Sequence, residues 1–193
     1  MKSTVHTLPH ALGTPALLGR GVKLFFIVIV CFSPLHCFAD VSTHVKQPGI
    51  TGGAGSMDGL VTLLLRGLKQ QDRKTLESIY ITRDEYDRWI WPQLPVSKKK
   101  QWQNRKSMNL VWSQHHLRST HGLTSVLENY GGNTYSLLKL QPAEQTRDYT
   151  TYKIYSDMQV CVKDASGTEH WLKLFGSIVH INNIYKIFSY NIR

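Results

Sequence analysis

His180 carries a side chain that is suited to acid–base chemistry or ligand binding near neutral pH, because an imidazole titrates between about pH 5 and 8. A two-residue turn at Asn182-Asn183 predicts that Tyr185 pairs with it across a hairpin, and the preceding strand brings Tyr152 beside it. This Tyr–His–Tyr row could transfer protons or hold a polar ligand. The alternative is a histidine that only fills its place in a sheet between two tyrosines.

A turn between the preceding strands predicts which residues share a face. Residues 164–168 suit a three-residue hairpin loop with Gly167 in the left-handed conformation, and this register pairs Val160 with Leu172. Continued along both strands, it sets Tyr152 opposite His180 and forms a row of small residues, where a ligand has room. The small residues are Ser156, Gly176 and Ser189. The sequence therefore predicts a pocket lined by Tyr152, Ser156, His180, Tyr185 and Ser189.

Three histidines near the middle of the chain, His115, His116 and His121, form the other group that could hold a metal ion. His116 and His121 are five positions apart, whereas residues on one helix face are three or four apart, and adjacent histidines point apart. We therefore expect a solvated, histidine-rich helix and no metal. The sequence also lacks a glycine-rich phosphate loop with its lysine, a Cys-x-x-Cys pair and a Gly-x-Ser-x-Gly elbow, so no cofactor is expected.

A basic cluster precedes these histidines. Lys98-Lys99-Lys100, Arg105 and Lys106 are interleaved with Trp102, a composition typical of nucleic-acid or anionic-surface patches. Because the chain is predicted to be exported, as argued below, we expect no nucleic-acid partner. The cluster indicates a solvated helix face, with weak attraction to anionic membrane lipid or cell-wall polymer as the alternative.

The elements that must position these residues are helical up to Gly131 and strand-like from Thr134 onward. Ser56, Asp72 and Thr82 are predicted to cap three successive helices, and Thr82 has the spacing of a capping box. A long polar helix is predicted after Ser97, closed by Gly131-Gly132. The sequence thus predicts an α+β fold, with N-terminal helices packed on a curved antiparallel sheet.

This order of elements resembles the nuclear-transport-factor-2-like superfamily of cone-shaped α+β domains. The likeness rests on the helix over residues 59–72, the short helices that end at Trp91-Pro92, the Tyr130-Gly131-Gly132 junction, and the closing strands over residues 171–180 and 185–192. The resemblance implies a pocket between helices and sheet, which that superfamily uses for isomerases, dehydratases, hydrolases and non-catalytic modules. Its isomerases use a carboxylate base that faces the pocket. Here the strand acids Asp157 and Glu169 are predicted to face the other way, which leaves Asp148 or Glu128 as alternatives.

The N-terminus has the features of a cleavable signal peptide. An apolar run over residues 24–32 follows Lys23 and precedes Ser33-Pro34, and it is too short for a membrane-spanning helix, which needs about 20 residues. Cys37-Phe38-Ala39 places small residues where a signal peptidase cleaves. We therefore expect residues 1–39 to be removed and the mature protein to be periplasmic or secreted.

Composition bounds the mature chain. Removal of the leader leaves 154 of the 193 residues, enough for one domain, and takes Lys2, Arg20 and Lys23, so that 20 basic and 13 acidic residues give a net charge of +7. Cys161 is then the only cysteine, so no intrachain disulfide is expected. Residues 40–56, rich in Gly, Ser, Thr and Pro, are predicted to be a flexible linker, and residues 57–193 a single domain.

The sheet's other face is predicted to carry more apolar surface than a soluble monomer exposes. We expect this face to form a homodimer, or to be covered by another exported protein or a neighbouring helix. Its residues are Trp171, Phe175, Val179, Phe188 and Tyr190.

Together these features predict an exported, non-catalytic binding or assembly module that takes a small molecule or a protein partner. One alternative is a pocket enzyme of hydrolase or isomerase type that uses His180 with Tyr152 or Tyr185. The other is a component of a cell-envelope secretion or conjugation assembly.

Overall fold

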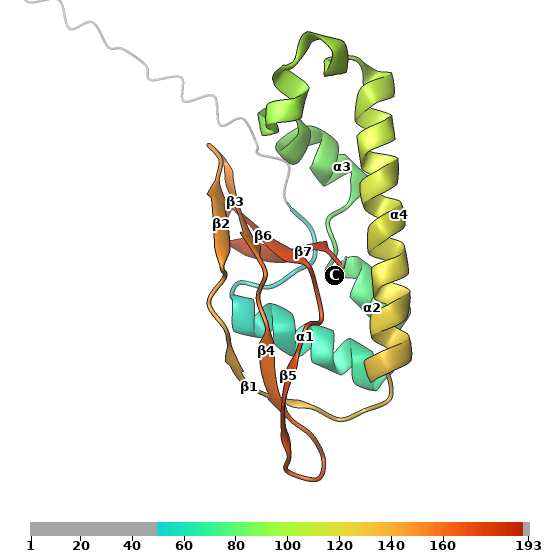
Figure 1. Cartoon of the computed structure of the whole chain (residues 1–193), viewed down its shortest axis with the longest axis vertical. Helices are drawn as coiled ribbons and strands as arrows, with labels where there is room; N and C mark the ends of the chain where they lie inside the picture. Colours follow the sequence, from blue (N-terminus) through green and yellow to red (C-terminus); the bar gives the residue numbers. More distant parts are fainter. Residues whose placement is uncertain (1–49, 191–193) are drawn as a thin grey trace, which may run out of the picture. The chain divides into compact units, whose positions relative to one another are not determined.

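The computed structural model describes residues 50–190 of the chain (Figure 1). The predicted signal peptide, residues 1–39, and residues 40–49 of the predicted linker lie outside the described residues. No helix within residues 50–190 is both long and apolar enough to cross a membrane. The described part thus begins with the end of the predicted linker and continues to Tyr190.

Helices form the first half of the described chain. Ser56, Asp72 and Thr82 cap the first three helices with their side chains, as predicted, and Thr82 forms a capping box with Glu85. The helical elements are α1 (Met57–Lys69), α2 (Arg73–Ser78), α3 (Arg83–Glu85), a π-helical turn η1 (Tyr86–Ile90), the 3-10 turns η2 (Trp91–Gln93), η3 (Pro95–Lys98) and η4 (Lys100–Trp102), and α4 (Arg105–Tyr130).

The long helix α4 starts later than predicted. Ser97 Oγ donates to the Leu94 carbonyl at 2.8 Å, and Lys99 has an extended backbone that separates η3 from η4. Asn104 is the true cap, since its Oδ1 accepts the backbone N–H of Ser107 at 2.9 Å. The basic cluster therefore begins on 3-10 turns and is not the continuous helix face that the sequence predicted.

The second half of the described chain forms two antiparallel sheets, so the predicted α+β class is confirmed. One sheet has the order β1-β4-β5 and the other β2-β3-β6-β7. The strands are β1 (Ser136–Leu140), β2 (Gln145–Asp148), β3 (Tyr152–Ser156), β4 (Val160–Lys163), β5 (Glu169–Leu172), β6 (Ser177–Ile181) and β7 (Ile184–Ser189).

Both predicted hairpins form in the predicted register near their turns. Val160 pairs with Leu172, and Gly167 has φ 88° in the turn between β4 and β5. Across Asn182-Asn183, His180 pairs with Tyr185. Each register follows from local turn chemistry.

The first register does not continue into the other sheet, and this prediction is wrong. Residues 157–159 lie opposite residues 173–176, one residue more, so Tyr152 pairs with Ile181 instead of His180. His180 pairs with Lys153. A slip of one residue turns each side chain to the other face of the sheet. Tyr152 and His180 therefore point away from each other.

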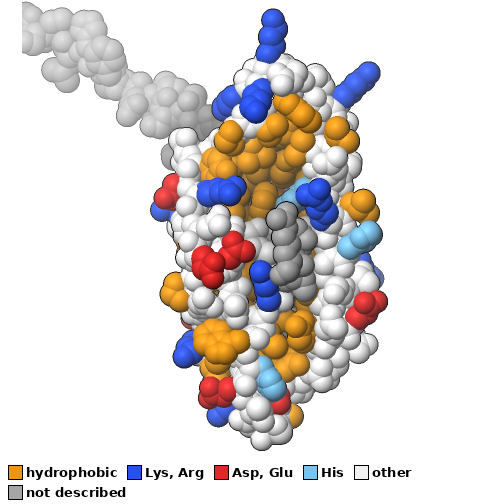
Figure 2. All heavy atoms as spheres, in the orientation of Figure 1, with side chains coloured by type: hydrophobic (Ala, Val, Ile, Leu, Met, Phe, Trp, Pro, Cys, Tyr) orange, Lys and Arg blue, Asp and Glu red, His pale blue; other side chains and the backbone are white. Residues whose placement is uncertain are grey.

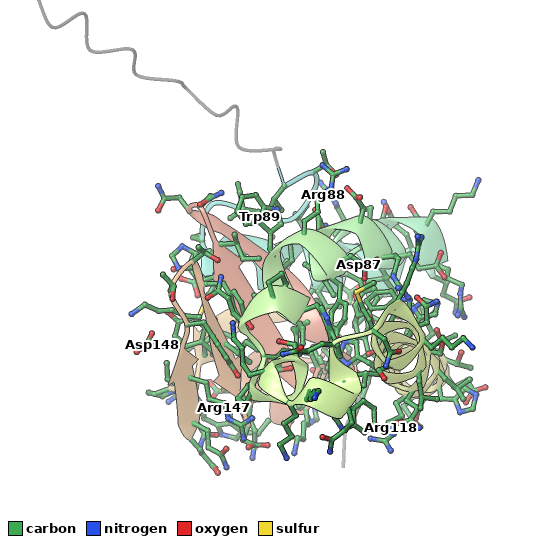
Figure 3. The ribbon with its side chains drawn as sticks, turned by 90° about the horizontal axis from the view of Figure 1, so that it is seen from above. Asp87, Arg88, Trp89, Arg118, Arg147 and Asp148 are labelled. Atoms are coloured by element: carbon green, nitrogen blue, oxygen red, sulfur yellow. The ribbon has the colours of Figure 1, made fainter. Side chains whose placement is uncertain are left out.

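The helices and the sheets pack around one core. α1 contacts β1 and β7 as well as α2 and α4, and its side chains Leu60, Leu64 and Leu68 are fully buried. On the face shown in Figure 2, apolar side chains gather over the region of η1–η4, and basic side chains project around them. Seen from above in Figure 3, the sheet edge with Arg147 lies across the molecule from α4 with Arg118.

A buried ion pair joins the sheet to the helical layer. Lys186 on β7 donates to both Glu85 carboxylate oxygens, at 2.8 and 3.1 Å, and to the Thr51 carbonyl at 2.8 Å. Burial acts to raise the pKa of Glu85, but the hydrogen bonds from Lys186 and Thr82 outweigh it and lower that pKa. Ala54 exchanges backbone hydrogen bonds with Tyr185. The end of the predicted linker is therefore bound to the domain and does not act as a free tether.

Candidate functional site

Tyr152, the first residue of the predicted pocket, is a core residue. It is 2% exposed, its ring stacks on Tyr149 at 4.4 Å between centroids, and its hydroxyl donates to the Ile90 carbonyl at 3.3 Å. Burial raises the pKa of its phenol well above the usual value. Tyr152 therefore anchors β3 to the end of η1 and takes no part in a row with His180.

His180 and Tyr185 do lie together, on the opposite face of the sheet. Their rings stack at 4.2 Å with planes 9° apart. Burial, and after it the positive charge of Lys153, lowers the pKa of His180. Neither ring lines either of the two pockets described below. The stacked pair therefore lies outside both of these pockets.

Ser156 and Ser189 are brought together. Both line a pocket of about 400 Å³ at the end of the four-stranded sheet, where each pairs with Ser177. Gly176, the predicted middle member of this row, lies beside Ser177 at the same pocket. The predicted space next to small residues exists. The residue between Ser156 and Ser189 in the cross-strand row is Ser177, however, and not the predicted Gly176.

The predicted apolar outer face does not exist as a continuous surface. Phe175, Val179 and Tyr190 are at most 1% exposed within this chain, and Phe188 packs against the His115 ring with centroids 4.6 Å apart. Of the five predicted interface residues, Trp171 alone is widely exposed, at 49%. The prediction that these five residues form an open interface is wrong, because the register slip and the helices bury four of them wholly or in part.

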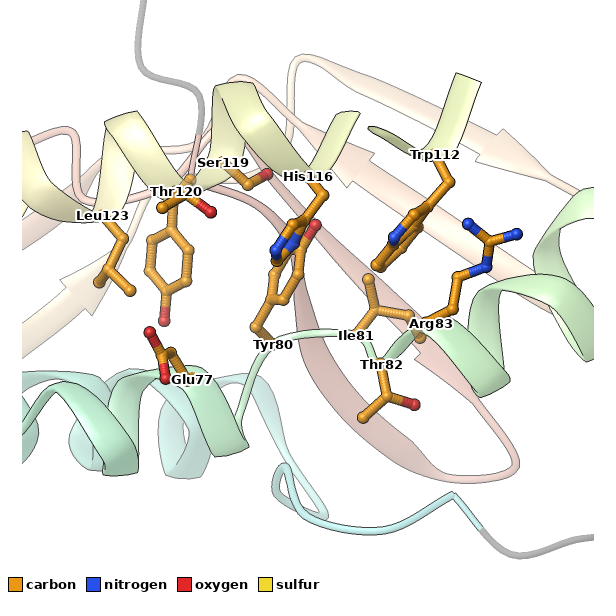
Figure 4. Close-up of a pocket in the computed structure, with 11 residues that line it drawn as sticks. Glu77, Tyr80, Ile81, Thr82, Arg83, Trp112, His116, Ser119, Thr120 and Leu123 are labelled. Carbon is orange, nitrogen blue, oxygen red and sulfur yellow. The ribbon is translucent and has the colours of Figure 1, made fainter. Parts of the chain in front are cut away.

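A pocket that the sequence analysis missed lies between α4 and the link from α2 to α3 (Figure 4). Its volume is about 420 Å³. Figure 4 shows Trp112, His116, Ser119, Thr120 and Leu123 of α4 facing the segment that contains Tyr80, Ile81, Thr82 and Arg83. We call this cavity the α4 pocket; Glu77 and Tyr190 complete it.

Aromatic rings form much of the wall of the α4 pocket. Trp112 stacks on His116, with ring centroids 5.4 Å apart and ring planes 11° apart. The ring centroids of Tyr80 and Tyr190 are 6.0 Å apart. Tyr190 is held by a hydrogen bond from its hydroxyl to the Leu76 carbonyl at 2.7 Å. Such flat, polarisable walls favour a flat ligand that can stack on them.

Two hydroxyl groups in this wall have no hydrogen-bond partner among the described residues. They belong to Tyr80 and Ser119, which are 8% and 2% exposed. Burial raises the pKa of Tyr80 to about 12, although the neighbouring Ser119 hydroxyl acts in the opposite direction. The Tyr80 phenol therefore stays protonated at neutral pH. Because a buried hydroxyl without a partner costs free energy, a group that enters the pocket and bonds to this pair would offset that cost.

The charged groups at the rim of the α4 pocket are already paired. Arg83 Nε lies 2.8 Å from Asp87 Oδ2, and its guanidinium lies over the Trp112 ring at 5.6 Å. Glu77 accepts from Arg73 Nε at 2.8 Å. These pairs fix the rim and leave it close to neutral, so charge is not the main feature that a ligand would meet.

No hydrogen bond among the described residues links the titratable side chains that line the α4 pocket to each other. His116 makes no hydrogen bond to Tyr80, to Ser119 or to any other described residue. His115 turns inward instead, with Nε2 donating to the Phe188 carbonyl at 2.8 Å. Within residues 50–190, no three metal-ligating side chains come together.

Part of this pocket was readable from the sequence. Trp112, His116, Ser119 and Leu123 recur at helical spacing, which places them on one face of α4. Tyr80 gives no such signal, because no local pattern indicates how the link from α2 to α3 crosses α4.

Comparison with protein-family models, with curated proteins and with solved structures finds no match to this chain.

Proposed function

We propose that this domain is a non-catalytic binding module that holds a small, flat, mainly apolar ligand in the α4 pocket. The observation that carries the proposal is the pair of buried hydroxyls, Tyr80 and Ser119, which have no partner within the described chain and border a cavity of about 420 Å³. Pockets of about 300–1,000 Å³ with apolar walls and few polar groups are typical of small-molecule sites.

The walls suggest the chemistry of the ligand. Trp112 and His116 offer stacking surfaces, and Leu123 and Ile81 offer apolar contact. Tyr80 and Ser119 can each donate one hydrogen bond. A conjugated ring system that carries an uncharged acceptor, such as a carbonyl oxygen, satisfies both requirements.

The enzyme alternative loses its main support. A base and its partner must lie within hydrogen-bond reach of the reacting group, but Tyr152 and His180 are on opposite faces of the sheet. In the α4 pocket, His116 has no hydrogen bond that would orient or activate it. Binding without chemistry requires neither arrangement.

We also propose that the protein is exported. This part of the proposal depends on the predicted signal peptide over residues 1–39. The resemblance to the nuclear-transport-factor-2-like superfamily likewise stays a prediction, supported by the order of helices and strands. A role in an envelope assembly is compatible with the same pocket, since a bound ligand can stabilise a component of a larger complex.

A fluorescence titration tests the proposal. The probe is 6-propionyl-2-(dimethylamino)naphthalene, a flat uncharged naphthalene with one carbonyl acceptor, titrated into the protein of residues 40–193. Thr120→Phe places a ring in the α4 pocket, whereas Gln114→Phe adds the same ring to an exposed position of α4 outside it. We expect saturable binding to the wild type and to Gln114→Phe, and binding at least about tenfold weaker to Thr120→Phe, because the added ring fills the cavity.

Two results of this titration would contradict the proposal. Absence of saturable binding by the wild type would overturn the proposal, as would equal affinity of the two variants. Circular dichroism of both variants checks that each is folded before the affinities are compared.

A further inference from the structure

The basic cluster lies in a part of the chain that carries no acid. Residues 88–127 contain seven lysines and arginines but neither aspartate nor glutamate. The five residues of the cluster are all exposed, and none of them has a carboxylate within salt-bridge distance among the described residues. They are Lys98, Lys99, Lys100, Arg105 and Lys106. Five positive charges are therefore available to an anionic partner.

The surrounding fold does not account for these charges. Asp87 lines a hollow together with Arg105, but its Oδ2 pairs with Arg83 Nε at 2.8 Å. Arg105 and Lys106 are the first two residues of α4, which has no acid in its first turn. Cations at this end of a helix oppose its dipole and lower its stability. The cluster thus costs α4 some stability and gains no ion pair within the described chain.

Apolar side chains accompany the basic cluster on the same turns. Trp102 of η4 is half-buried and is not among the side chains that pack against the described core. Pro92 and Pro95 are exposed, and Leu94 and Val96 are half-buried. Figure 2 shows apolar side chains gathered over η1–η4 with basic side chains projecting around them. A membrane interface accepts such a surface, because apolar groups enter the headgroup region while the cations stay with the lipid phosphates.

We infer that this surface, formed by η2, η3, η4 and the first turn of α4, docks on a membrane of anionic phospholipids. Each basic residue close to such a membrane contributes about fivefold to the affinity. Tryptophan rings favour the level of the headgroups, which gives Trp102 a place. An anionic cell-wall polymer would need the charges but not the apolar side chains, whereas a membrane uses both.

The inference goes beyond the proposed function and does not depend on it. None of the five basic residues lines the α4 pocket, and neither does Trp102. Loss of small-molecule binding would therefore leave membrane docking intact, and the reverse also holds.

Co-sedimentation with lipid vesicles tests the inference. The protein of residues 40–193 is used, because the described core lies within residues 50–190 and the apolar run over residues 24–32 would itself bind lipid. One set of vesicles is phosphatidylcholine alone, and the other is equal parts of phosphatidylcholine and phosphatidylglycerol. We expect binding to the mixed vesicles that is at least about a hundredfold tighter than to phosphatidylcholine, since several cations contribute.

A triple variant tests the basic cluster. Lys98→Gln, Lys99→Gln and Lys100→Gln together should weaken binding to the mixed vesicles about a hundredfold, because three contributions of about fivefold are lost. These side chains are exposed, so the fold should be unaffected, and circular dichroism checks this.

The matched control removes the same net charge elsewhere. Lys69→Gln, Lys74→Gln and Lys163→Gln together change three exposed lysines that lie on α1, α2 and β4. This variant should lose less than about fivefold in affinity, because charges beyond about 10 Å from the lipid are largely screened by salt.

Trp102→Gln tests the apolar part of the surface without a change of charge. It should weaken binding to the mixed vesicles severalfold, because the ring no longer enters the headgroup region. Trp171→Gln is its control and should leave the affinity unchanged. Trp171 is an exposed tryptophan on β5, at the bottom of Figure 1, whereas the yellow-green turns with the basic cluster lie at the top.

Three results would overturn the inference. The first is equal binding to both kinds of vesicle, or no binding to either. The second is an equal loss of affinity in the two triple variants, since the net charge of the protein would then account for the binding. The third is an unchanged affinity of Trp102→Gln, which would leave a site for anionic polymers that uses charge alone.

Discussion

Lys186 Nζ lies 2.8 Å from Glu85 Oε2, and the two side chains are 1% and 7% exposed. This contact joins the last strand to the capping box of α3, because Glu85 also accepts the backbone N–H groups of Thr82 and Thr51. The same lysine donates to the Thr51 carbonyl. One buried ion pair therefore fixes three segments that are far apart in the sequence, and it holds α3 at the edge of the α4 pocket.

Removal of Lys186 should strongly destabilise the fold. Lys186→Met leaves the Glu85 carboxylate buried without its cation, which costs about 3–5 kcal/mol of unfolding free energy. Urea unfolding followed by circular dichroism measures this loss. The control is Lys153→Met, which breaks an exposed pair with Asp148 and should have no measurable effect. Equal stability of the two variants would contradict the structural role of the buried pair.

Acid should weaken the fold through His115. Burial lowers the pKa of His115 from 6.5 to about 4, so the folded state binds the proton less readily than the unfolded state. This contribution to stability is fully present above pH 6.5 and is lost as the pH falls towards 4. Between pH 7.5 and 5 the loss should be about 2 kcal/mol. Urea unfolding at both pH values measures it.

Two substitutions separate His115 from the other histidines. His115→Phe removes the titrating group. The free energies of unfolding at pH 7.5 and pH 5 should then differ by about 2 kcal/mol less than in the wild type, even if the substitution lowers stability at both pH values. His121→Gln changes an exposed histidine of the same helix and should keep the full difference. If His115→Phe keeps it as well, His115 is not the source of the acid sensitivity.

Phe188 should behave as a packing residue and not as an interface residue. Phe188→Asp introduces a charge beside the His115 ring and should lower the free energy of unfolding by about 2 kcal/mol or more. Trp171→Asp, at an exposed position, should change stability much less. Thermal unfolding measures the loss of stability, and light scattering shows whether Phe188→Asp changes the oligomeric state. Together they distinguish a packing role of Phe188 from an interface role. A stable, folded monomer formed from a wild-type dimer by Phe188→Asp would instead restore the original interface prediction.

The parts of the fold that were predicted correctly depend on local chemistry. Ser56, Asp72 and Thr82 cap helices because each side chain can reach a backbone N–H three residues ahead. The turns around Gly167 and Asn182-Asn183 set their hairpins in the same local way. These features need no knowledge of the rest of the chain.

The predicted site failed where the packing is not local. The extra residue within residues 173–176, opposite residues 157–159, shifts the pairing by one, and no recognised turn motif marks it. Tyr152 is consequently separated from His180, while Ser156 and Ser189 still share a pocket. The α4 pocket was missed because Tyr80 meets Ser119 only through the packing of α4 on the α2–α3 link. Sequence spacing on α4 shows one wall of that pocket and gives no sign of the other.

The measurement that tests the central claim most directly compares Tyr80→Phe with the wild type in both stability and binding of the naphthalene probe. The unpartnered hydroxyl of Tyr80 costs free energy in the empty protein, so its removal should raise the free energy of unfolding by about 1 kcal/mol. The same change removes a donor from the α4 pocket and should weaken probe binding severalfold. Stability and affinity are thus expected to change in opposite directions. A variant that is less stable and binds the probe as well as the wild type would show that this hydroxyl serves the fold alone, and the proposed binding function would be contradicted.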